Sequence, residues 1–226
     1  KQDHSIRHEG ASSIAIVVDS GGDLPEDYLK EVHVGQVRYS FGSQQHIDGV
    51  TQSKQDFYRQ MATDSNHPKT SQPTPGDFRK TYNFISSHYN HIISIHLSKL
   101  TSGTYQSALN ASKKIKIENI KIIDSYSASV GLGLLVMYAV DLKQQGKTFK
   151  EIVSLVNKKR FKIEVYLAID DLTYIVRGGR LSSNIKSIAN ILKLRPVLGT
   201  KKGKITARGV LYGKSNTVAK FAKFLD

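Results

Sequence analysis

Hydroxyl side chains gather in one short turn of the sequence. The stretch HLSKLTSGTYQSA places Thr101, Ser102 and Thr104 around Gly103, after an apolar run and before a helical pattern. A turn that begins a helix offers free backbone N–H groups, the positive end of the helix dipole and side-chain donors, which together suit a carboxylate or a phosphate. An ordinary helix N-cap uses the same residue types, so the spacing alone leaves both interpretations open.

A second hydroxyl-bearing turn precedes another helical pattern. In KTSQPTPGDF, Thr70 and Ser71 stand before two prolines that stiffen the loop, and the chain then runs into a helix. Taken alone, this segment is more simply a proline-rich connection without a ligand. Two such turns together would supply the donors that a carboxylate needs when the rest of its molecule is out of water.

Other motif-like segments do not support an enzyme. GVLYGKS (209–215) has three residues between its glycines, where a phosphate-binding P-loop needs four. GLG (131–133) lies in a helical apolar run and lacks the third glycine of a dinucleotide loop, so close helix packing explains it better. Asp19 and Asp23 would suit a phosphate or a metal, although Asp and Gly after an apolar run more often form a turn. The sequence contains no Gly-x-Ser-x-Gly.

The composition excludes several classes of protein. The 226 residues include no cysteine, which excludes a disulfide scaffold and thiolate chemistry and is compatible with the cytoplasm. The longest apolar run, 130–140, is far shorter than the roughly 20 residues of a membrane-spanning helix. The net charge of +14 predicts attraction to polyanions, phosphorylated molecules, acidic partners or anionic lipid surfaces. A merely solvated basic surface explains the charge as well, because the lysine clusters are separate and lack an aromatic stacking pattern.

Strands and helices are predicted to alternate along the chain. Three β-branched apolar runs are typical of buried parallel strands: 13–20, 91–98 and 120–125. Pro75 suits the first turn of a helix, and a Thr-x-x-Glu capping box opens another at Thr148. After Pro75, one apolar stripe is expected to face the core: Phe78, Tyr82 and Ile85. This alternation predicts an α/β fold with a mainly parallel sheet and flanking helices.

The chain is predicted to form two domains. Residues 1–13 have no apolar pattern and are expected to be a frayed arm or a cloning remnant. An N-terminal α/β domain spans 14–160, and a second, smaller α/β domain spans 161–226. For the second domain we expect a strand at its start, a helix near 184–192 and a hairpin around KKGK.

Five ordered segments resemble the signature stretches of the DegV family, the bacterial fatty acid-binding proteins: IAIVVDSGGDLPEDYL, TSQPTPGDF, LTSGTYQSA, IIDSYSASVGLGLLV and YIVRGGRLS…ILKLRPVL…GKI. The resemblance implies a two-domain α/β protein whose interdomain cleft holds a long-chain fatty acid, with the tail buried and the carboxylate near the surface. It also implies a cytoplasmic carrier without enzyme activity of its own. Such a carrier is the subunit of a fatty acid kinase that presents the acyl group to an ATP-binding partner, which makes acyl phosphate for phospholipid metabolism.

The resemblance assigns six residues to the carboxylate site: Thr70, Ser71, Ser102, Gly103, Thr104 and Arg180. The Thr-Ser pair and Ser102 would bind the carboxylate, while Gly103 and Thr104 would shape the seat. Arg180 would neutralise the carboxylate or the acyl phosphate formed from it; otherwise it is an ordinary arginine at a helix end. Apart from the fatty acid, the resemblance implies no cofactor, no metal and no catalytic residue. It implies no specific nucleic acid, and it allows only transient contact with a membrane surface.

The end of the sequence departs from the family pattern. Asp226 stands inside an apparent helix without a stop signal. An apolar stripe on that helix needs a partner surface: Val218, Phe221, Ala222 and Leu225. We therefore expect the second domain to be incomplete.

Two other classes of function stay open at this point. A basic module for nucleic acid or for an acidic partner predicts binding that weakens steeply with salt. A hydrolase or kinase with its own active site ranks last, because the sequence shows no general base, nucleophile elbow or P-loop.

Overall fold

The computed structural model describes residues 13–115, 119–180, 194–213 and 216–225. Its strands are β1 (Ile14–Asp19), β2 (His33–Gly35), β3 (Arg38–Phe41), β4 (Gln44–Ile47), β5 (Lys69–Ser71), β6 (His91–His96), β7 (Asn119–Asp124), β8 (Tyr166–Ala168), β9 (Leu194–Lys201) and β10 (Lys204–Tyr212). Its helices are α1 (Glu26–Leu29), α2 (Lys54–Thr63), α3 (Pro75–Ser86), α4 (Thr104–Ser112), α5 (Ser129–Gln144), α6 (Phe149–Lys159), α7 (Thr173–Arg177) and α9 (Thr217–Leu225).

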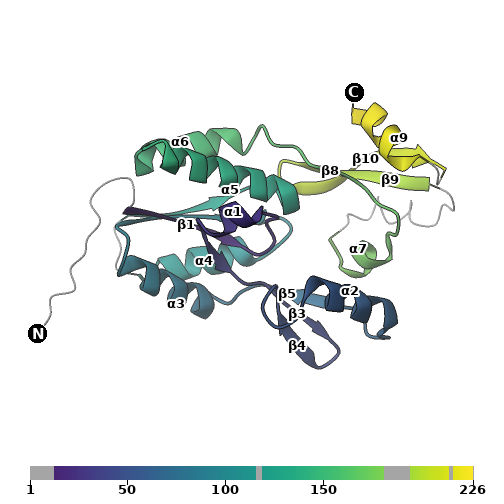
Figure 1. Ribbon diagram of the computed structural model, residues 1–226, viewed down its shortest axis with the longest axis horizontal. Coiled ribbons are helices and arrows are strands. Elements are labelled where there is room, and N and C mark those ends of the chain that lie inside the picture. The colour runs from purple at the N-terminus through teal and green to yellow at the C-terminus, as the bar shows by residue number, and fades with distance from the viewer. Residues whose placement is uncertain (1–12, 116–118, 181–193, 214–215, 226) are drawn as a thin grey trace, which may run out of the picture.

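Four parallel strands form the central sheet, in the order β2-β1-β6-β7. All six residues of β1 are buried. Helices α3 and α4 pack on one face of the sheet and α5 and α6 on the other, each pair forming a hydrophobic core with it (Figure 1). The apolar runs predicted as parallel strands are β1, β6 and β7, and the predicted α/β fold class is confirmed.

Local sequence determines where α3 begins. The hydroxyl of its N-cap, Thr74, accepts a hydrogen bond from the N–H of Asp77, whose carboxylate accepts one from the N–H of Thr74. Pro75 follows in the first turn, as predicted. The predicted apolar stripe is buried: Phe78, Tyr82 and Ile85. The capping box predicted at Thr148 opens α6 in the same way.

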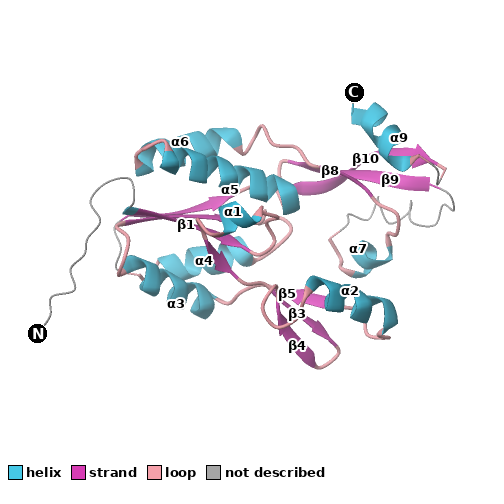
Figure 2. Ribbon diagram, viewed as in Figure 1, coloured by secondary structure: helices cyan, strands magenta, loops and turns pink. Residues whose placement is uncertain are grey.

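A small antiparallel sheet, β4-β3-β5, was not anticipated from the sequence. It lies beyond the carboxyl edge of the parallel sheet, beside α2 (Figure 2). Its strands have three or four residues each, and β4 and β5 are mostly polar and exposed, so they lack a clear strand pattern. In this sheet Arg38 pairs with Ser71 and Tyr39 with Thr70. The second hydroxyl turn is therefore held against β3 through the strand β5.

A third sheet, β10-β9-β8, follows α6 along the chain. The predicted hairpin at KKGK is confirmed, since Lys201 pairs with Lys204 at the turn between β9 and β10. The division into domains at residue 161 stays a prediction. The predicted helix near 184–192 and all but Ser13 of the predicted arm lie outside the described residues. Within the described ranges, no helix is both long enough and apolar enough to cross a membrane.

Candidate functional site

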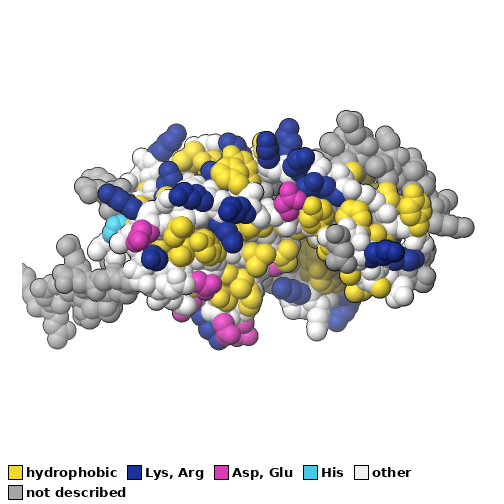
Figure 3. Space-filling view, turned by 90° about the horizontal axis from the view of Figure 1, so that it is seen from above, with side chains coloured by type: hydrophobic (Ala, Val, Ile, Leu, Met, Phe, Trp, Pro, Cys, Tyr) yellow, Lys and Arg dark blue, Asp and Glu magenta, His cyan; other side chains and the backbone are white. Residues whose placement is uncertain are grey.

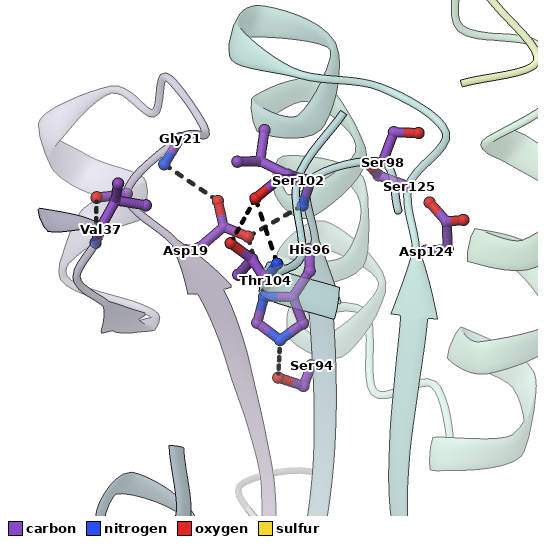
Figure 4. Close-up of polar contacts among 12 residues, drawn as sticks. Asp19, Gly21, Val37, Ser94, His96, Ser98, Ser102, Thr104, Asp124 and Ser125 are labelled. Carbon is purple, nitrogen blue, oxygen red and sulfur yellow. Dashed lines mark hydrogen bonds and ion pairs between the residues drawn. The ribbon is translucent and has the colours of Figure 1, made fainter. Parts of the chain in front are cut away.

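The loops that leave β1, β6 and β7 meet at the carboxyl edge of the parallel sheet (Figure 4). Ser102 lies in the loop after β6, where its Oγ accepts a hydrogen bond from the N–H of Thr104 at 3.2 Å and lies 2.8 Å from the Thr104 hydroxyl oxygen. Gly103 is the N-cap of α4 and offers no side chain to the helix. The carboxyl edge of a parallel sheet is where α/β folds usually bind ligands, and the first N–H groups of a helix suit an anion.

One glutamine brings the two hydroxyl turns together. Gln72 directly follows Ser71, and its Nε2 donates to the Oγ of Ser107 on α4 at 3.0 Å. Its amide oxygen occupies the space beside Gly103, where an added Cβ would lie only 1.9 Å from that oxygen. The contact between the turns therefore requires glycine at position 103. The structure thus joins two segments that are some 30 residues apart in the sequence.

A cavity of about 840 Å³ adjoins this edge, between the small β4-β3-β5 sheet with α2 and the helix α7. This volume is within the range typical of small-molecule sites. Of the six predicted seat residues, Thr70 and Arg180 are in the cavity wall. The other four are not among the described residues that line it: Ser71, Ser102, Gly103 and Thr104.

The cavity wall combines an apolar surface with an excess of cations. The apolar part consists of four aromatic and five other residues: Tyr39, Phe57, Tyr58 and Tyr174, with Val37, Met61, Pro68, Ile175 and Ile205. Four cationic residues face two acidic ones: Lys54, Lys69, Arg177 and Arg180 against Asp23 and Asp48. Arg180 is exposed and donates to the carbonyl oxygen of Gly178. Such a wall suits an amphiphile with an anionic head. Figure 3 shows a hollow in the surface with hydrophobic side chains on its floor.

A tyrosine ties α7 to α2 and to the segment after it. The ring of Tyr174 stacks on His67, with ring centroids 5.3 Å apart, and its hydroxyl donates to the carbonyl oxygen of Met61 at 3.3 Å. All three residues line the cavity. The contact therefore connects two walls of the cavity that come from distant parts of the chain.

Arg38 holds both ends of the segment that carries the second hydroxyl turn. Its backbone pairs with Ser71, and its guanidinium binds the two carboxylate oxygens of Asp77 at 2.7 and 3.0 Å. This bidentate pair keeps the pKa of Asp77 well below its ordinary value of 3.8, and the Thr74 hydroxyl and N–H act in the same direction. The turn is thus held between β3 and α3 by one residue, through its backbone at one end and its side chain at the other.

The Arg38–Asp77 pair predicts a specific dependence of stability on pH. Because the pKa of Asp77 is depressed in the folded protein, the pair stabilises the fold fully above the ordinary pKa of 3.8, and this contribution falls as the pH drops below it. We expect Arg38→Gln to lower the melting temperature at pH 6, and the difference from wild type to shrink at pH 3. Thermal unfolding at both pH values measures this. The exposed pair Arg59–Asp56 provides the control variant Arg59→Gln, for which we expect little change at either pH. A difference for Arg38→Gln that is as large at pH 3 as at pH 6 would contradict the assignment.

Beneath the carboxyl edge runs a buried chain of hydrogen bonds that sequence analysis missed. Asp19 accepts from the backbone N–H groups of Gly21 and Leu97, so its carboxylate is the acceptor for the Nδ1 of His96 at 3.0 Å. The Nε2 of His96 is then left to accept from the Ser94 hydroxyl at 2.7 Å, and Ser94 accepts from the hydroxyl of Tyr82 at 2.8 Å. With the hydrogen bonds oriented in this way, every donor in this buried network has an acceptor.

The order Asp19–His96–Ser94 is that of a hydrolase triad, but its burial gives it another role. The side chains of all three residues are fully buried in the sheet, so no substrate can reach the Ser94 hydroxyl. Burial also raises the pKa of Tyr82, which keeps its proton on the phenol. The interpretation of Asp19 as a phosphate or metal ligand is therefore replaced by a structural one. Asp19 joins the loops after β1 and β6, which lead into the site.

Comparison with known proteins places the chain in a family. The sequence matches the model of the DegV family, described as "Uncharacterised protein, DegV family", over residues 13–226. The DegV domain-containing protein SACOL1460 of Staphylococcus aureus (strain COL) is 35% identical over 184 residues, which cover 80% of this chain and 65% of that protein. The chain thus spans slightly less than two thirds of that relative's length.

Solved structures share the fold. The fatty acid-binding DegV family protein of Thermus thermophilus superimposes with a TM-score of 0.85 at 26% identity, over 94% of this chain and 76% of that one. The stearic acid-binding protein of Eubacterium ventriosum does so with a TM-score of 0.84 at 27% identity, over 94% and 77%. Because the family match extends over nearly the whole sequence, the chain belongs to the DegV family.

Proposed function

We propose that the chain binds a long-chain fatty acid, with the carboxylate at the two hydroxyl turns and the acyl tail along the apolar wall of the cavity. The observation that carries this proposal is the contact between Gln72 and Gly103, which joins the turns beside a largely apolar cavity. The Thermus and Eubacterium proteins, which share the fold, bind fatty acids. In this proposal the predicted seat keeps its six residues, with Thr70 and Arg180 nearest to the cavity.

The charges around the cavity support a carboxylate as the head group. Lys69 directly precedes Thr70, and Arg177 and Arg180 approach from α7 and its end, so cations stand on both sides. A cation beside a buried carboxylate forms stronger hydrogen bonds than a neutral donor does. Burial contributes about 0.8 kcal/mol for each CH₂ group. The tail therefore supplies most of the affinity, and the seat determines its orientation.

Loss of one seat hydroxyl should weaken binding. We expect Ser102→Ala to reduce the affinity for a fatty acid about 5- to 150-fold, equivalent to roughly 1 to 3 kcal/mol for an unsatisfied buried acceptor. Titration calorimetry on the delipidated protein measures this. Ser87→Ala is the matched control, because Ser87 is exposed at the C-cap of α3. An unchanged affinity in Ser102→Ala would exclude Ser102 from the seat.

The class of ligand can be tested without a variant. Native mass spectrometry of the purified protein, followed by denaturing extraction, should release a long-chain fatty acid. A protein that carries no fatty acid, and that takes up none from added oleate, would contradict the proposal.

We further propose that the chain is a cytoplasmic carrier without enzyme activity of its own, which presents the carboxylate to the ATP-binding subunit of a fatty acid kinase. The inaccessible Ser94 hydroxyl supports this, because the triad-like residues offer no nucleophile to a substrate. Loaded protein is incubated with ATP, with and without the kinase subunit, and acyl phosphate is trapped with hydroxylamine. We expect product only when both proteins are present. Product from the chain alone, or none from the mixture, would contradict the carrier role.

A further inference from the structure

A stacked cluster of side chains lies where α6 ends. The guanidinium carbon of Arg160 lies 4.8 Å from the ring centroid of Tyr126 and 4.9 Å from that of Phe161, and the two rings are 5.3 Å apart. The Nη1 of Arg160 donates to the carbonyl oxygen of Asp124 at 2.7 Å, which ties the cluster to the end of β7. The arginine is therefore held in place by the fold before any partner binds.

The turn between β9 and β10 extends this cluster. The hydroxyl of Ser98 donates to the carbonyl oxygen of Gly203 at 2.8 Å. A Cβ at position 203 would lie 2.9 Å from the ring of Tyr126 and 3.5 Å from the side chain of Leu100. Gly203 also has a φ of +83°, which favours glycine. We call the resulting surface the Arg160 platform, and its members are Leu100, Tyr126, Arg160, Phe161 and Gly203.

The platform has an exposed apolar centre and a cationic surround. Phe161 is 62% exposed and Leu100 is 49% exposed. Four exposed lysines are direct neighbours of platform residues in the sequence: Lys99, Lys162, Lys202 and Lys204. None of these four forms an ion pair with another described residue. Figure 3 shows Lys and Arg side chains interspersed with hydrophobic ones over α6 and toward the third sheet.

The backbone of Tyr126 adopts a conformation that needs a reason. Its φ of +54° is in the left-handed region, which is unfavourable for a bulky residue, and its N–H donates to the carboxylate of Asp124 at 3.0 Å. Such conformations are retained mainly where they serve function. Here the conformation places the tyrosine ring against both Arg160 and the β9–β10 turn.

We propose that the Arg160 platform is the docking surface for an acidic protein that acts on the head group of the bound ligand. This inference rests on the proposed function and names the face of the chain that the kinase subunit contacts. Leu100 and Lys99 lie in the same loop as Ser102, so a protein docked on the platform reaches the predicted seat. An apolar centre with arginine and aromatic residues inside a charged rim is typical of protein interfaces.

The platform favours a protein over a nucleic acid. Single-stranded nucleic acids bind to successive exposed aromatic rings along a basic groove. In the platform Phe161 is the exposed ring, while the ring of Tyr126 is covered by Arg160 and the β9–β10 turn. The exposed aliphatic side chain of Leu100 also suits a protein partner better than it suits a base.

Two platform variants test the proposal on the full chain loaded with oleate. The first is Phe161→Ser, and the second is the double variant Lys202→Glu/Lys204→Glu. The matched control for charge is Lys80→Glu/Lys150→Glu, because both lysines are exposed on α3 and α6 and lie outside the platform. Binding to the ATP-binding subunit of fatty acid kinase from the same organism is measured by surface plasmon resonance at low and high salt. We expect each platform variant to bind the subunit at least tenfold more weakly, and the control to bind like wild type. Oleate affinity and melting temperature should be unchanged in all of them.

Each contrary result has its own meaning. If both platform variants bound the kinase subunit as tightly as wild type does, the platform would not be the docking surface. The proposed carrier function would be unaffected by that result. Failure of wild type to bind the subunit would overturn both the platform and the kinase role, while the oleate measurement reports on fatty acid binding separately. Loss of oleate in the variants would assign these residues to the ligand site instead. Tight binding of a single-stranded RNA oligonucleotide that the variants abolish would identify a nucleic acid surface.

Discussion

Replacing His96 with leucine is expected to lower the free energy of unfolding by about 3 kcal/mol, at the upper end of the usual cost of leaving buried polar groups without a hydrogen-bond partner, because one of these groups is a carboxylate. The substitution leaves the carboxylate of Asp19 buried with only the backbone N–H groups of Gly21 and Leu97. It also leaves the Ser94 hydroxyl without its acceptor. Urea denaturation followed by circular dichroism measures the change.

The loss of stability should be smaller for a residue farther from Asp19 along the buried chain of hydrogen bonds. Tyr82→Phe removes the hydroxyl farthest from Asp19, and the remaining bonds persist, so we expect a loss of only about 1 kcal/mol. His88→Leu is the control for loss of an imidazole, because His88 is exposed at the end of α3, and we expect a change within about 0.5 kcal/mol. If His96→Leu lowered the free energy of unfolding as little as His88→Leu does, the buried hydrogen bonds would not be holding the fold together.

The parts of the fold that could be predicted from the sequence are those with a local cause. Buried parallel strands are continuous β-branched runs, which is why β1, β6 and β7 are visible in the sequence. The capping boxes at Thr74 and Thr148 depend on residues only three positions apart. The two hydroxyl turns stood out for the same reason.

Features that depend on contacts between distant residues were not predictable. The strand β5 exists because β3 pairs with it, and its residues Lys69–Ser71 have no strand pattern of their own. The requirement for glycine at position 103 arises from the side chain of Gln72, about 30 residues away. The buried chain did leave a signal, since Ser94 and His96 are polar residues two positions apart in an apolar strand and therefore face the same side. Their partner Asp19 was interpreted as a turn or a ligand because its contact with His96 spans 77 residues.

Gly133→Ala is expected to destabilise the protein by about 3 kcal/mol, at the upper end of the usual cost of overpacking. Gly133 lies in α5, and a Cβ there would be 2.0 Å from the backbone carbonyl oxygen of Asp23. That backbone cannot move freely, because the N–H of Asp23 donates to Ser129 at 3.3 Å and the Ser129 hydroxyl donates to the Asp23 carboxylate at 2.5 Å. Since Asp23 lines the cavity, the shift should also weaken fatty acid binding.

The same substitution at another helical glycine should have the opposite sign. Gly76 is in the first turn of α3, and a Cβ there would meet only the Thr74 hydroxyl oxygen, at an ordinary 3.4 Å. Because alanine restricts the unfolded chain and favours a helix, Gly76→Ala is expected to stabilise the protein by about 0.5 to 1 kcal/mol. Chemical denaturation of the two variants in parallel separates the steric effect from the helix preference. If Gly133→Ala were also neutral or stabilising, α5 would not lie against the loop after β1, and the cavity wall at Asp23 would have to be formed in another way.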